Sequence, residues 1–392
     1  MNKSIVFFLS FMALTACTKT QTTGIYLENL DTTAVAQNDF YQYACGGWMK
    51  NNPIPDEYSR FGSFDKLGLS NLEQVNGLIA DIAAGTHKMG SIPQKIGDVY
   101  NLSMDTARRN QEGIAPVLPV LQEIENVTDK AQWSQVLGKA MDFGLWAMYV
   151  DADAMNSSMN ILNEYQAGFA LSQKDYYIDE DEHTKHIREE YVKHVEKMFE
   201  LFGQENAAEK AQTVLRLETR LANAALSNVE LRDPVANYNK MSVEELQKLV
   251  PEVDWKVYFA GLNIAPDSLS VGQVRHLQEA GKMLAEESLE DMKTLFTWQV
   301  IDGSADFLTE EIFMQNFEFY GRILSGRQEP TPLWKRAVAM VNGTLGEAVG
   351  QMYVEKYFPE ENKERMIGLV KNLQVALGER IQALEWMSDE TK

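Results

Sequence analysis

The chain has 392 residues, of which 45% are hydrophobic and 24% charged, and this balance excludes wholesale disorder. Its net charge of −21 disfavours nucleic acid as a partner, because phosphates attract a basic surface, and helps to keep the protein soluble. The sequence also lacks a glycine-rich loop with the spacing of a nucleotide-binding fingerprint.

The N-terminal segment MNKSIVFFLSFMALTAC combines an early lysine with the apolar run Ile5–Leu14, which is too short to cross a bilayer as a stable helix. This pattern predicts a secretory signal peptide over residues 1–17. Its end, Leu14–Cys17, resembles a bacterial lipobox, so we expect a lipid on Cys17; an ordinary signal peptide with an incidental cysteine is the alternative. The polar residues 18–37 would then form a tether.

The expected location follows from the same segment. We expect an exported protein that is anchored to a membrane through the lipid on Cys17. By resemblance to Gram-negative lipoproteins, the absence of Asp after Cys17 favours the outer membrane, on either its periplasmic or its external face.

Beyond Asn38, apolar residues recur mostly at helical spacing, and Ser70 with Glu73 has the register of a capping box that begins a helix. The other predicted helices are 93–110, 117–126, 130–143, 183–202, 207–228, 243–250, 272–300, 309–324, 332–357 and 362–384. The stretch LWAMYVDADAMNSSMNILNEYQAGFAL differs, because short apolar and aromatic runs at 146–150, 160–163 and 168–171 predict a small β element. The predicted fold class is therefore mainly α, a multi-helix domain with a minor β element.

The chain ends on LEWMSDETK, which contains a signal for a further helix. Ser388 is a good N-cap residue, and the acidic Asp389 and Glu390 follow it, where the helix dipole favours negative charge. Residues 385–392 are thus expected to begin a new helix.

Few residues suggest catalysis. His183, His186 and His194 share one face of a predicted helix, but His194 is too far along the axis to complete a zinc site with the other two, so a solvated face is expected. The sequence contains no HExxH motif and no GxSxG elbow. Cys45 is the one cysteine besides Cys17, so no disulfide framework is expected within the chain.

One stretch has a different character: NDFYQYACGGWMKNNPIPDEYSRFGSFDKL, residues 38–67. Acidic and aromatic residues alternate before Gly46-Gly47-Trp48, which we interpret as a tight turn. Arg60 follows among aromatic residues. Such an arginine is often packed by its stem or simply exposed, but it can also clamp a carboxylate with two parallel hydrogen bonds while a nearby Asp holds it.

This stretch resembles the N-terminal signature of the neprilysin and endothelin-converting-enzyme family of zinc metallopeptidases, in its bacterial lipoprotein branch. Further similar segments follow in order: LSQKDYY, LSNVELRDPVANYNKMSVEEL, FYGRILSGRQEPTPLWKRAVAMVNGTLGEAVGQMYVEKYFP and LEWMSDETK. The resemblance implies that residues 38–384 are the N-terminal helical domain and that 385–392 begin the linker helix to a catalytic domain missing from this chain.

The resemblance also implies a chemistry: hydrolysis of oligopeptides by a zinc-bound water, with zinc held by HExxH and a downstream ExxxD segment. No HExxH occurs here, so the chain alone is expected to be inactive, with no cofactor of its own and no catalytic or metal-binding residues. The family assigns to Arg60 the binding of the substrate's terminal carboxylate, with Asp65 as its support. In animal relatives the cysteine of CGGW forms a disulfide; Cys45 is expected to be a buried free thiol or to pair only with a partner missing from this chain.

Two alternatives remain open at this stage. A separate chain could supply the zinc site and complete a split peptidase. The chain could also be a free-standing, non-enzymatic helical lipoprotein that binds peptides or glycans, since it contains 7 Trp and 15 Tyr, although scattered aromatic residues usually form cores.

Overall fold

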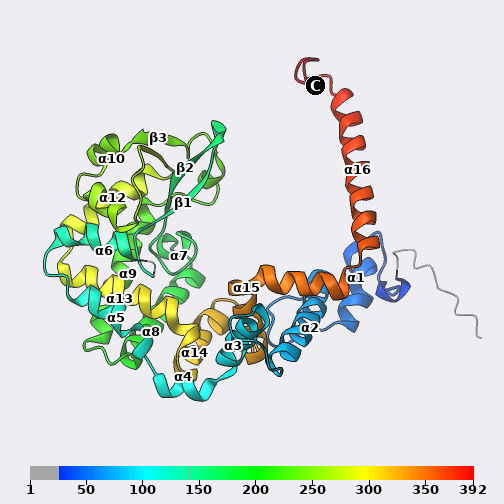
Figure 1. Ribbon diagram of the computed structural model, residues 1–392, viewed down its shortest axis with the longest axis horizontal. Helices are drawn as coiled ribbons and strands as arrows, with labels where there is room; N and C mark the ends of the chain where they lie inside the picture. The colour runs from blue at the N-terminus through cyan, green and yellow to red at the C-terminus, as the bar shows by residue number, and fades with distance from the viewer. Residues whose placement is uncertain (1–25, 141) are drawn as a thin grey trace, which may run out of the picture. The chain divides into compact units, whose positions relative to one another are not determined.

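The computed structural model describes residues 26–140 and 142–392. Helices dominate, as predicted, and Figure 1 labels most of them. The α-helices are α1 (Phe40–Asn51), α2 (Ser63–Ala83), α3 (Ile92–Met104), α4 (Thr106–Glu112), α5 (Leu118–Glu125), α6 (Trp133–Lys139), α7 (Asp175–Ile178), α8 (Glu182–Leu201), α9 (Ala207–Ala224), α10 (Val243–Leu249), α11 (Trp255–Gly261), α12 (Val274–Glu286), α13 (Leu289–Ser304), α14 (Glu310–Asn316), α15 (Leu333–Tyr357) and α16 (Glu360–Gln382).

Short helical turns join several of these elements. The 3-10 turns are η1 (Leu27–Asn29), η2 (Ala115–Val117), η3 (Lys130–Gln132), η4 (Glu230–Arg232) and η5 (Ala305–Phe307), and η6 (Phe317–Ile323) is a π-helix. No helix in the described part of the chain combines the length and the apolar character that crossing a bilayer would require.

The minor β element is a four-stranded sheet in the order β1-β2-β4-β3. The strands β1 (Trp146–Asp153) and β2 (Asn156–Gln166) form an antiparallel hairpin in which Trp146 pairs with Gln166. β4 (Ser268–Val271) pairs in parallel with β2, and β3 (Asn239–Ser242) closes the other edge. The sequence therefore predicted β1 and β2, missed β3 and β4, and was wrong about 168–171, which is not a strand.

Two compact units divide the chain: one comprises the described residues up to Pro55 with Arg60–Ser63, and the other comprises Asp56–Ser59 with Phe64–Lys392. In the first unit, the predicted turn at Gly46-Gly47-Trp48 is wrong, because all three residues belong to α1. Glycine is required at position 47 for a steric reason, because a side chain there would lie 2.7 Å from the carbonyl oxygen of Leu30. Gly47 thus allows the backbone of residues 28–30 to lie against α1.

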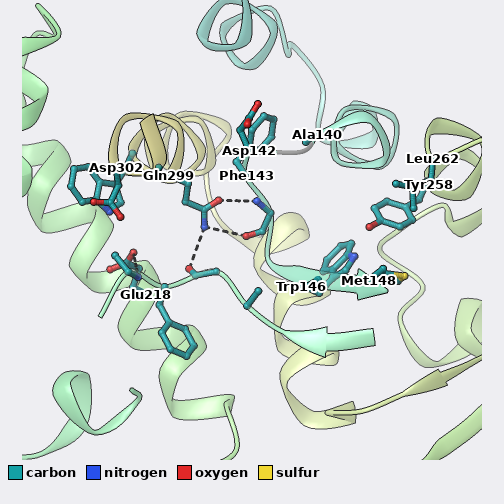
Figure 2. A pocket seen from close by; sticks show the side chains of 18 residues that line it. Ala140, Asp142, Phe143, Trp146, Met148, Glu218, Tyr258, Leu262, Gln299 and Asp302 are labelled. Atoms are coloured by element: carbon teal, nitrogen blue, oxygen red, sulfur yellow. Dashed lines mark hydrogen bonds between the residues drawn. The ribbon is translucent and has the colours of Figure 1, made fainter. Parts of the chain in front are cut away.

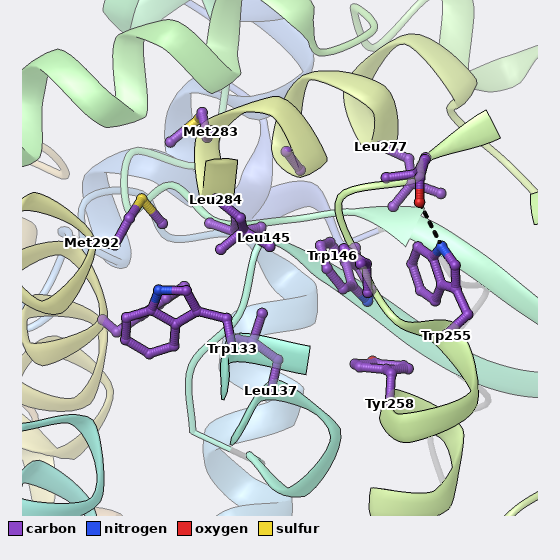
Figure 3. Packing of buried hydrophobic residues seen from close by; sticks show 14 of the residues in the cluster. Trp133, Leu137, Leu145, Trp146, Trp255, Tyr258, Leu277, Met283, Leu284 and Met292 are labelled. Carbon is purple, nitrogen blue, oxygen red and sulfur yellow. Dashed lines mark hydrogen bonds between the residues drawn. The ribbon is translucent and has the colours of Figure 1, made fainter. Parts of the chain in front are cut away.

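The largest core of the second unit lies between the sheet and α6, α9, α11, α12 and α13. Trp133, Trp146 and Trp255 are buried there, and Figure 3 shows them among aliphatic side chains from several elements. The Trp255 indole N–H donates to the carbonyl oxygen of Val250 at 3.1 Å, so this ring is buried without losing its hydrogen bond.

Two further cores complete the second unit. One joins α7, α8, α9 and α13 with η6, and Tyr191, Phe199 and Trp298 are its large buried side chains. The other is small and packs α15 on α3 and α2 through Ile79, Ile96, Val338, Val341 and Val349. α16 has no buried residue.

Candidate functional site

Arg60 lies in the connection between α1 and α2 and is exposed to solvent. In its own unit, Phe61 stacks on Trp48 with ring centroids 6.3 Å apart. In the other unit, the residues just before it are tied to α15, because Lys335 Nζ lies 2.5 Å from Glu57 Oε1. Glu57, three residues before the arginine, and Phe61, directly after it, thus each have a contact within their own unit.

Asp65 is half-buried in the first turn of α2, which begins at Ser63 rather than at the predicted Ser70. Ser70 is an exposed residue inside the helix, so its capping-box register has no structural role. The pairing of Asp65 with Arg60 stays a prediction. Cys17 lies outside the described residues, and Cys45 is a free cysteine that is half-buried rather than buried.

The histidines of α8 separate into two environments. His183 and His186 are exposed, but His194 is only 2% exposed, so the expected solvated face is wrong for this residue. The second half of α8 packs against α14 and η6, where the His194 ring stacks on Phe319 at 5.0 Å. Burial lowers the pKa of His194 to about 3, so its imidazole is neutral at physiological pH.

Metal binding finds no support in the described residues: among residues 26–140 and 142–392, no three His, Cys, Asp or Glu side chains come together as ligands of an ion. These residues therefore do not fit a catalytic zinc ion, and no step of hydrolysis can be assigned to them.

A cavity of about 470 Å³ lies where the loops flanking the β1–β2 hairpin meet α9, α11 and α13 (Figure 2). Gln299 of α13 holds the two loops in place. Its side-chain oxygen accepts from the Gly144 N–H at 2.9 Å, and its side-chain nitrogen donates to the carbonyl oxygens of Gly144 and Gly168. Gly168 has φ +103, a conformation that L side chains rarely adopt, and a side chain there would lie 3.1 Å from the Leu145 Cα.

Glu218 of α9 lies in the wall of this cavity and is fully buried. Its Oε2 accepts from the hydroxyls of Tyr177 at 3.0 Å and Tyr191 at 2.7 Å, and its Oε1 accepts from the Ala170 N–H at 3.1 Å. Burial nevertheless raises the pKa of Glu218 to about 8, because these donors offset only part of the lost hydration.

Asp302 of α13 faces Glu218 across one end of the cavity in Figure 2. Burial raises the pKa of Asp302 to about 7, and its Oδ1 is shielded from solvent without a hydrogen bond. The buried Tyr320 hydroxyl also lacks a hydrogen bond of ordinary geometry, although it is close enough to Asp302 to affect the pKa of the carboxyl group.

Neither acid was identified from the sequence. For Glu218 a signal existed: Val214, Leu217 and Leu221 form the apolar stripe of α9, and Glu218 falls within it. A charged residue on the buried face of a helix marks a position where the chain provides hydrogen-bond partners. Asp302 follows the apolar end of a predicted helix, and we find no pattern that distinguishes it.

The fold defines the class of the protein, a mainly α-helical domain with a small four-stranded sheet. The profile of peptidase family M13 matches residues 36–392, and the chain belongs to this family as its N-terminal portion. This confirms the resemblance to neprilysin-like zinc metallopeptidases.

Individual relatives agree with this membership. The chain is 26% identical over 384 residues to endothelin-converting enzyme-like 1 of Mus musculus, covering 93% of this chain and 49% of the relative. Endothelin-converting enzyme 1 of Homo sapiens is 25% identical over 387 residues, covering 94% and 50%. The crystal structure of the zinc metalloprotease Zmp1 of Mycobacterium tuberculosis, in complex with an inhibitor, superposes with a TM-score of 0.87 at 31% identity, covering 94% of this chain and 57% of that one. The chain thus spans about half the length of the curated relatives it matches.

Proposed function

We propose that this chain is the cap and substrate-access part of an exported, lipid-anchored zinc metalloendopeptidase that hydrolyses oligopeptides. The observation that carries the proposal is the match of nearly the whole described chain to a zinc metalloprotease at a TM-score of 0.87. Zinc and its general base would come from a catalytic domain outside these residues. The exposed apolar side chains of α16, which include Met366, Leu373 and Leu377, supply a surface that such a domain could cover.

The proposal that a domain outside these residues supplies the zinc site is tested directly by an assay of the 392-residue chain with a fluorogenic oligopeptide and added zinc. We expect no hydrolysis from the chain alone, because the described residues hold no group of metal ligands. A zinc-dependent, chelator-sensitive turnover by the purified chain would contradict the proposal.

Arg60 is the residue to which we assign substrate binding, as a clamp on the terminal carboxylate of a peptide with Asp65 as its support. A guanidinium group matches a carboxylate with two parallel hydrogen bonds, whereas an amidated C-terminus offers no charge to it. Its exposure leaves it accessible to a ligand.

Calorimetric titration with one tetrapeptide in its free-acid and amide forms tests this role. We expect the free acid to bind about tenfold more tightly, Arg60→Ala to remove the preference, and Arg60→Lys, which keeps the charge but not the two parallel hydrogen bonds, to reduce it. Arg365→Ala, which changes an exposed arginine of α16, is the matched control and should leave it intact. Equal binding of the two peptide forms by the unchanged chain would remove Arg60 from the site.

Membrane anchoring through Cys17 is a separate part of the proposal. The motif Leu14–Cys17 supports it, and a thiol at this position is the required acceptor of the lipid. In a Gram-negative host, metabolic labelling with a fatty acid should label the unchanged chain and not Cys17→Ser. Equal labelling of the two proteins would contradict lipidation, and membrane fractionation would show whether the outer membrane is the site.

A further inference from the structure

Strand β1 lies at one edge of the sheet, because the strand order is β1-β2-β4-β3. Within the described part of the chain, β2 is the element that β1 contacts at length. The outer edge of β1 therefore carries backbone groups that no neighbouring strand uses. An edge of this kind can accept a further strand.

The pairing register shows which backbone groups point to this outer edge. The Glu164 carbonyl oxygen accepts from the Gly272 N–H at 3.2 Å, so the backbone groups of Glu164 point away from β1. Glu164 pairs with Met148, and in an antiparallel ladder both members of such a pair point away from the opposite strand. The N–H and C=O groups of Met148, and those of Val150 two residues further along, therefore point outward.

The same edge lacks the features that usually prevent strand addition. Natural edge strands are commonly protected by charged side chains, by proline or by a bulge. Residues 146–150, with the sequence WAMYV, contain no charge and no proline. The bulge of β1 comes later, directly after Ala152, whose N–H already donates to Asp151 Oδ1 at 2.7 Å. The accessible edge is thus 146–150, where Tyr149 is 49% and Val150 is 65% exposed.

The cavity of about 470 Å³ borders this edge. Its wall includes three consecutive residues of β1: Trp146, Ala147 and Met148. Figure 2 shows Met148 beside Tyr258 and Leu262 of α11. Met148 and Leu262 are half-buried, so each keeps apolar surface that a ligand can contact. A side chain of an added strand therefore has an apolar recess next to the backbone groups that would bind the strand.

The charges near the edge favour a basic segment. Asp142 in the cavity wall and Asp151 toward the far end of β1 are both exposed. The described residues that line the cavity include no Lys, Arg or His. Exposed carboxylates attract a cationic side chain and disfavour an acidic one.

We propose that the outer edge of β1 binds an extended peptide segment by strand addition, with an apolar side chain of the segment in the cavity and a Lys or Arg near Asp142 or Asp151. In this mode of recognition, backbone hydrogen bonds supply affinity and the recess supplies selectivity. The surface lies within the second compact unit and includes neither Arg60 nor Asp65. The proposal is therefore independent of the carboxylate clamp and of peptide hydrolysis.

A short peptide with an amidated end tests strand addition without offering a terminal carboxylate to Arg60. The probe is fluorescein-Gly-Lys-Thr-Leu-Thr-Val-Lys-amide, and its fluorescence anisotropy reports binding to the full chain. The matched control is the same peptide methylated on the four backbone nitrogens between the lysines, which removes the N–H donors of both its edges. We expect the probe to bind at least ~tenfold more tightly than the methylated peptide. Equal affinities, or no binding of the probe, would overturn the proposal.

A second peptide, with Glu in place of both Lys residues, tests the expected charge preference. It should bind about fivefold more weakly than the probe at low salt, and the difference should shrink as salt is added. Equal affinities of the Lys and Glu peptides at low salt would overturn the preference for a basic segment.

Val150→Pro then locates the peptide on β1. The Val150 N–H points away from β2, so proline removes a donor for the added strand without breaking a hydrogen bond of the sheet. We expect about tenfold weaker binding of the probe. Val150→Thr, which keeps the N–H group at the same position, should bind as the unchanged chain does. Equal binding by all three proteins would remove this edge from the site.

Amide hydrogen exchange of the unchanged chain decides the location even if Val150→Pro fails to fold. Exchange at Met148 and Val150 should slow at least ~tenfold when the probe is bound, because both outward N–H groups then donate to the peptide. Binding without slower exchange at these two amides would place the peptide elsewhere and overturn the proposal. A dimer in sedimentation, with the two amides already protected before the probe is added, would assign the edge to a second copy of the chain and would also overturn it.

Discussion

α9 and α16 are both long amphipathic helices, but they have opposite environments. α9 has seven buried residues in 18, whereas α16 has none in 23. The apolar residues of α16 are about half exposed, for example Leu369 at 51% and Leu373 at 60% (α16 is red in Figure 1). An apolar stripe therefore indicates that a helix is meant to be covered, but it does not say which part of the protein covers it.

The largest expected effect compares one chemical change in the two helices. Leu217→Ala in α9 removes a fully buried side chain and should lower the free energy of unfolding by about 2–5 kcal/mol. Leu373→Ala in α16 should change it by less than about 0.5 kcal/mol, because that side chain is already in water. Urea unfolding of both variants measures the difference, and similar midpoints would mean that α16 is covered in solution.

Features of the fold that depend on a local sequence pattern were predicted well, whereas features that depend on contacts between distant residues were not. The predicted helix 332–357 agrees closely with α15, Leu333–Tyr357, because its spacing is a local property. By contrast, Gly46 and Gly47 suggested a turn and lie inside a helix, because what requires glycine there is the approach of residues 28–30. The predicted helix 272–300 is two helices, α12 and α13, separated where Ser288 caps the second.

In the candidate sites too, the sequence identified only residues that a local motif marks. Arg60 was found through a motif and lies in an accessible connection, but its pairing with Asp65 is still a prediction. Glu218, Asp302 and the buried His194 depend on contacts between residues up to 121 positions apart, as between His194 and Gln315, which no local pattern encodes. At the end of the chain, the Ser388 hydroxyl accepts from the Thr391 N–H at 3.3 Å, but residues 389–391 form a turn rather than a helix, so the expected start of a helix stays a prediction.

The pH dependence of stability should be the next largest effect, and it comes from the buried region alone. Burial raises the pKa of Glu218 to about 8 and that of Asp302 to about 7, whereas the unfolded chain ionises both near pH 4. Below that pH both states are protonated and stability is fully present; as pH rises, only the unfolded state loses protons, so stability falls until the folded groups ionise at about pH 7–8. Burial also raises the pKa of Glu164 to about 8, which adds to the fall, and lowers the pKa values of His194 and His276, which opposes it below about pH 6.5. The net expectation is a loss of a few kcal/mol between pH 5 and 8.

Urea midpoints between pH 5 and 8 measure how steeply the free energy of unfolding falls with pH. Asp302→Asn should make this fall less steep. The exposed Asp267→Asn should keep the slope of the unchanged chain. A stability that rises steadily from pH 5 to 8 would contradict the raised pKa values of the buried carboxyl groups.

Tyr191→Phe should have a smaller effect, again confined to the buried region. The Tyr191 hydroxyl donates to Glu218 and accepts from the Trp298 indole N–H, so its removal leaves the indole donor without a partner in a buried site. We expect a loss of about 1–3 kcal/mol in the free energy of unfolding. Tyr149→Phe, at a residue that is 49% exposed on β1, is the control and should be close to neutral.

The smallest expected effect is in α16. It tests whether the stability of this helix comes from its own helix propensity rather than from packing on other elements. A side chain on Gly378 would meet nothing within 4 Å, and its backbone is already helical, so Gly378→Ala should favour the helix by about 0.5–1 kcal/mol. Because α16 has no buried residue, this gain should appear as slower amide hydrogen exchange within 360–382 and leave the global urea midpoint unchanged. The low protection should be confined to α16 and should not extend to α15, since Val338 and Val341 of α15 are buried against α3. Exchange as slow in α16 as in α9, with or without Gly378→Ala, would show that a partner surface already covers the helix.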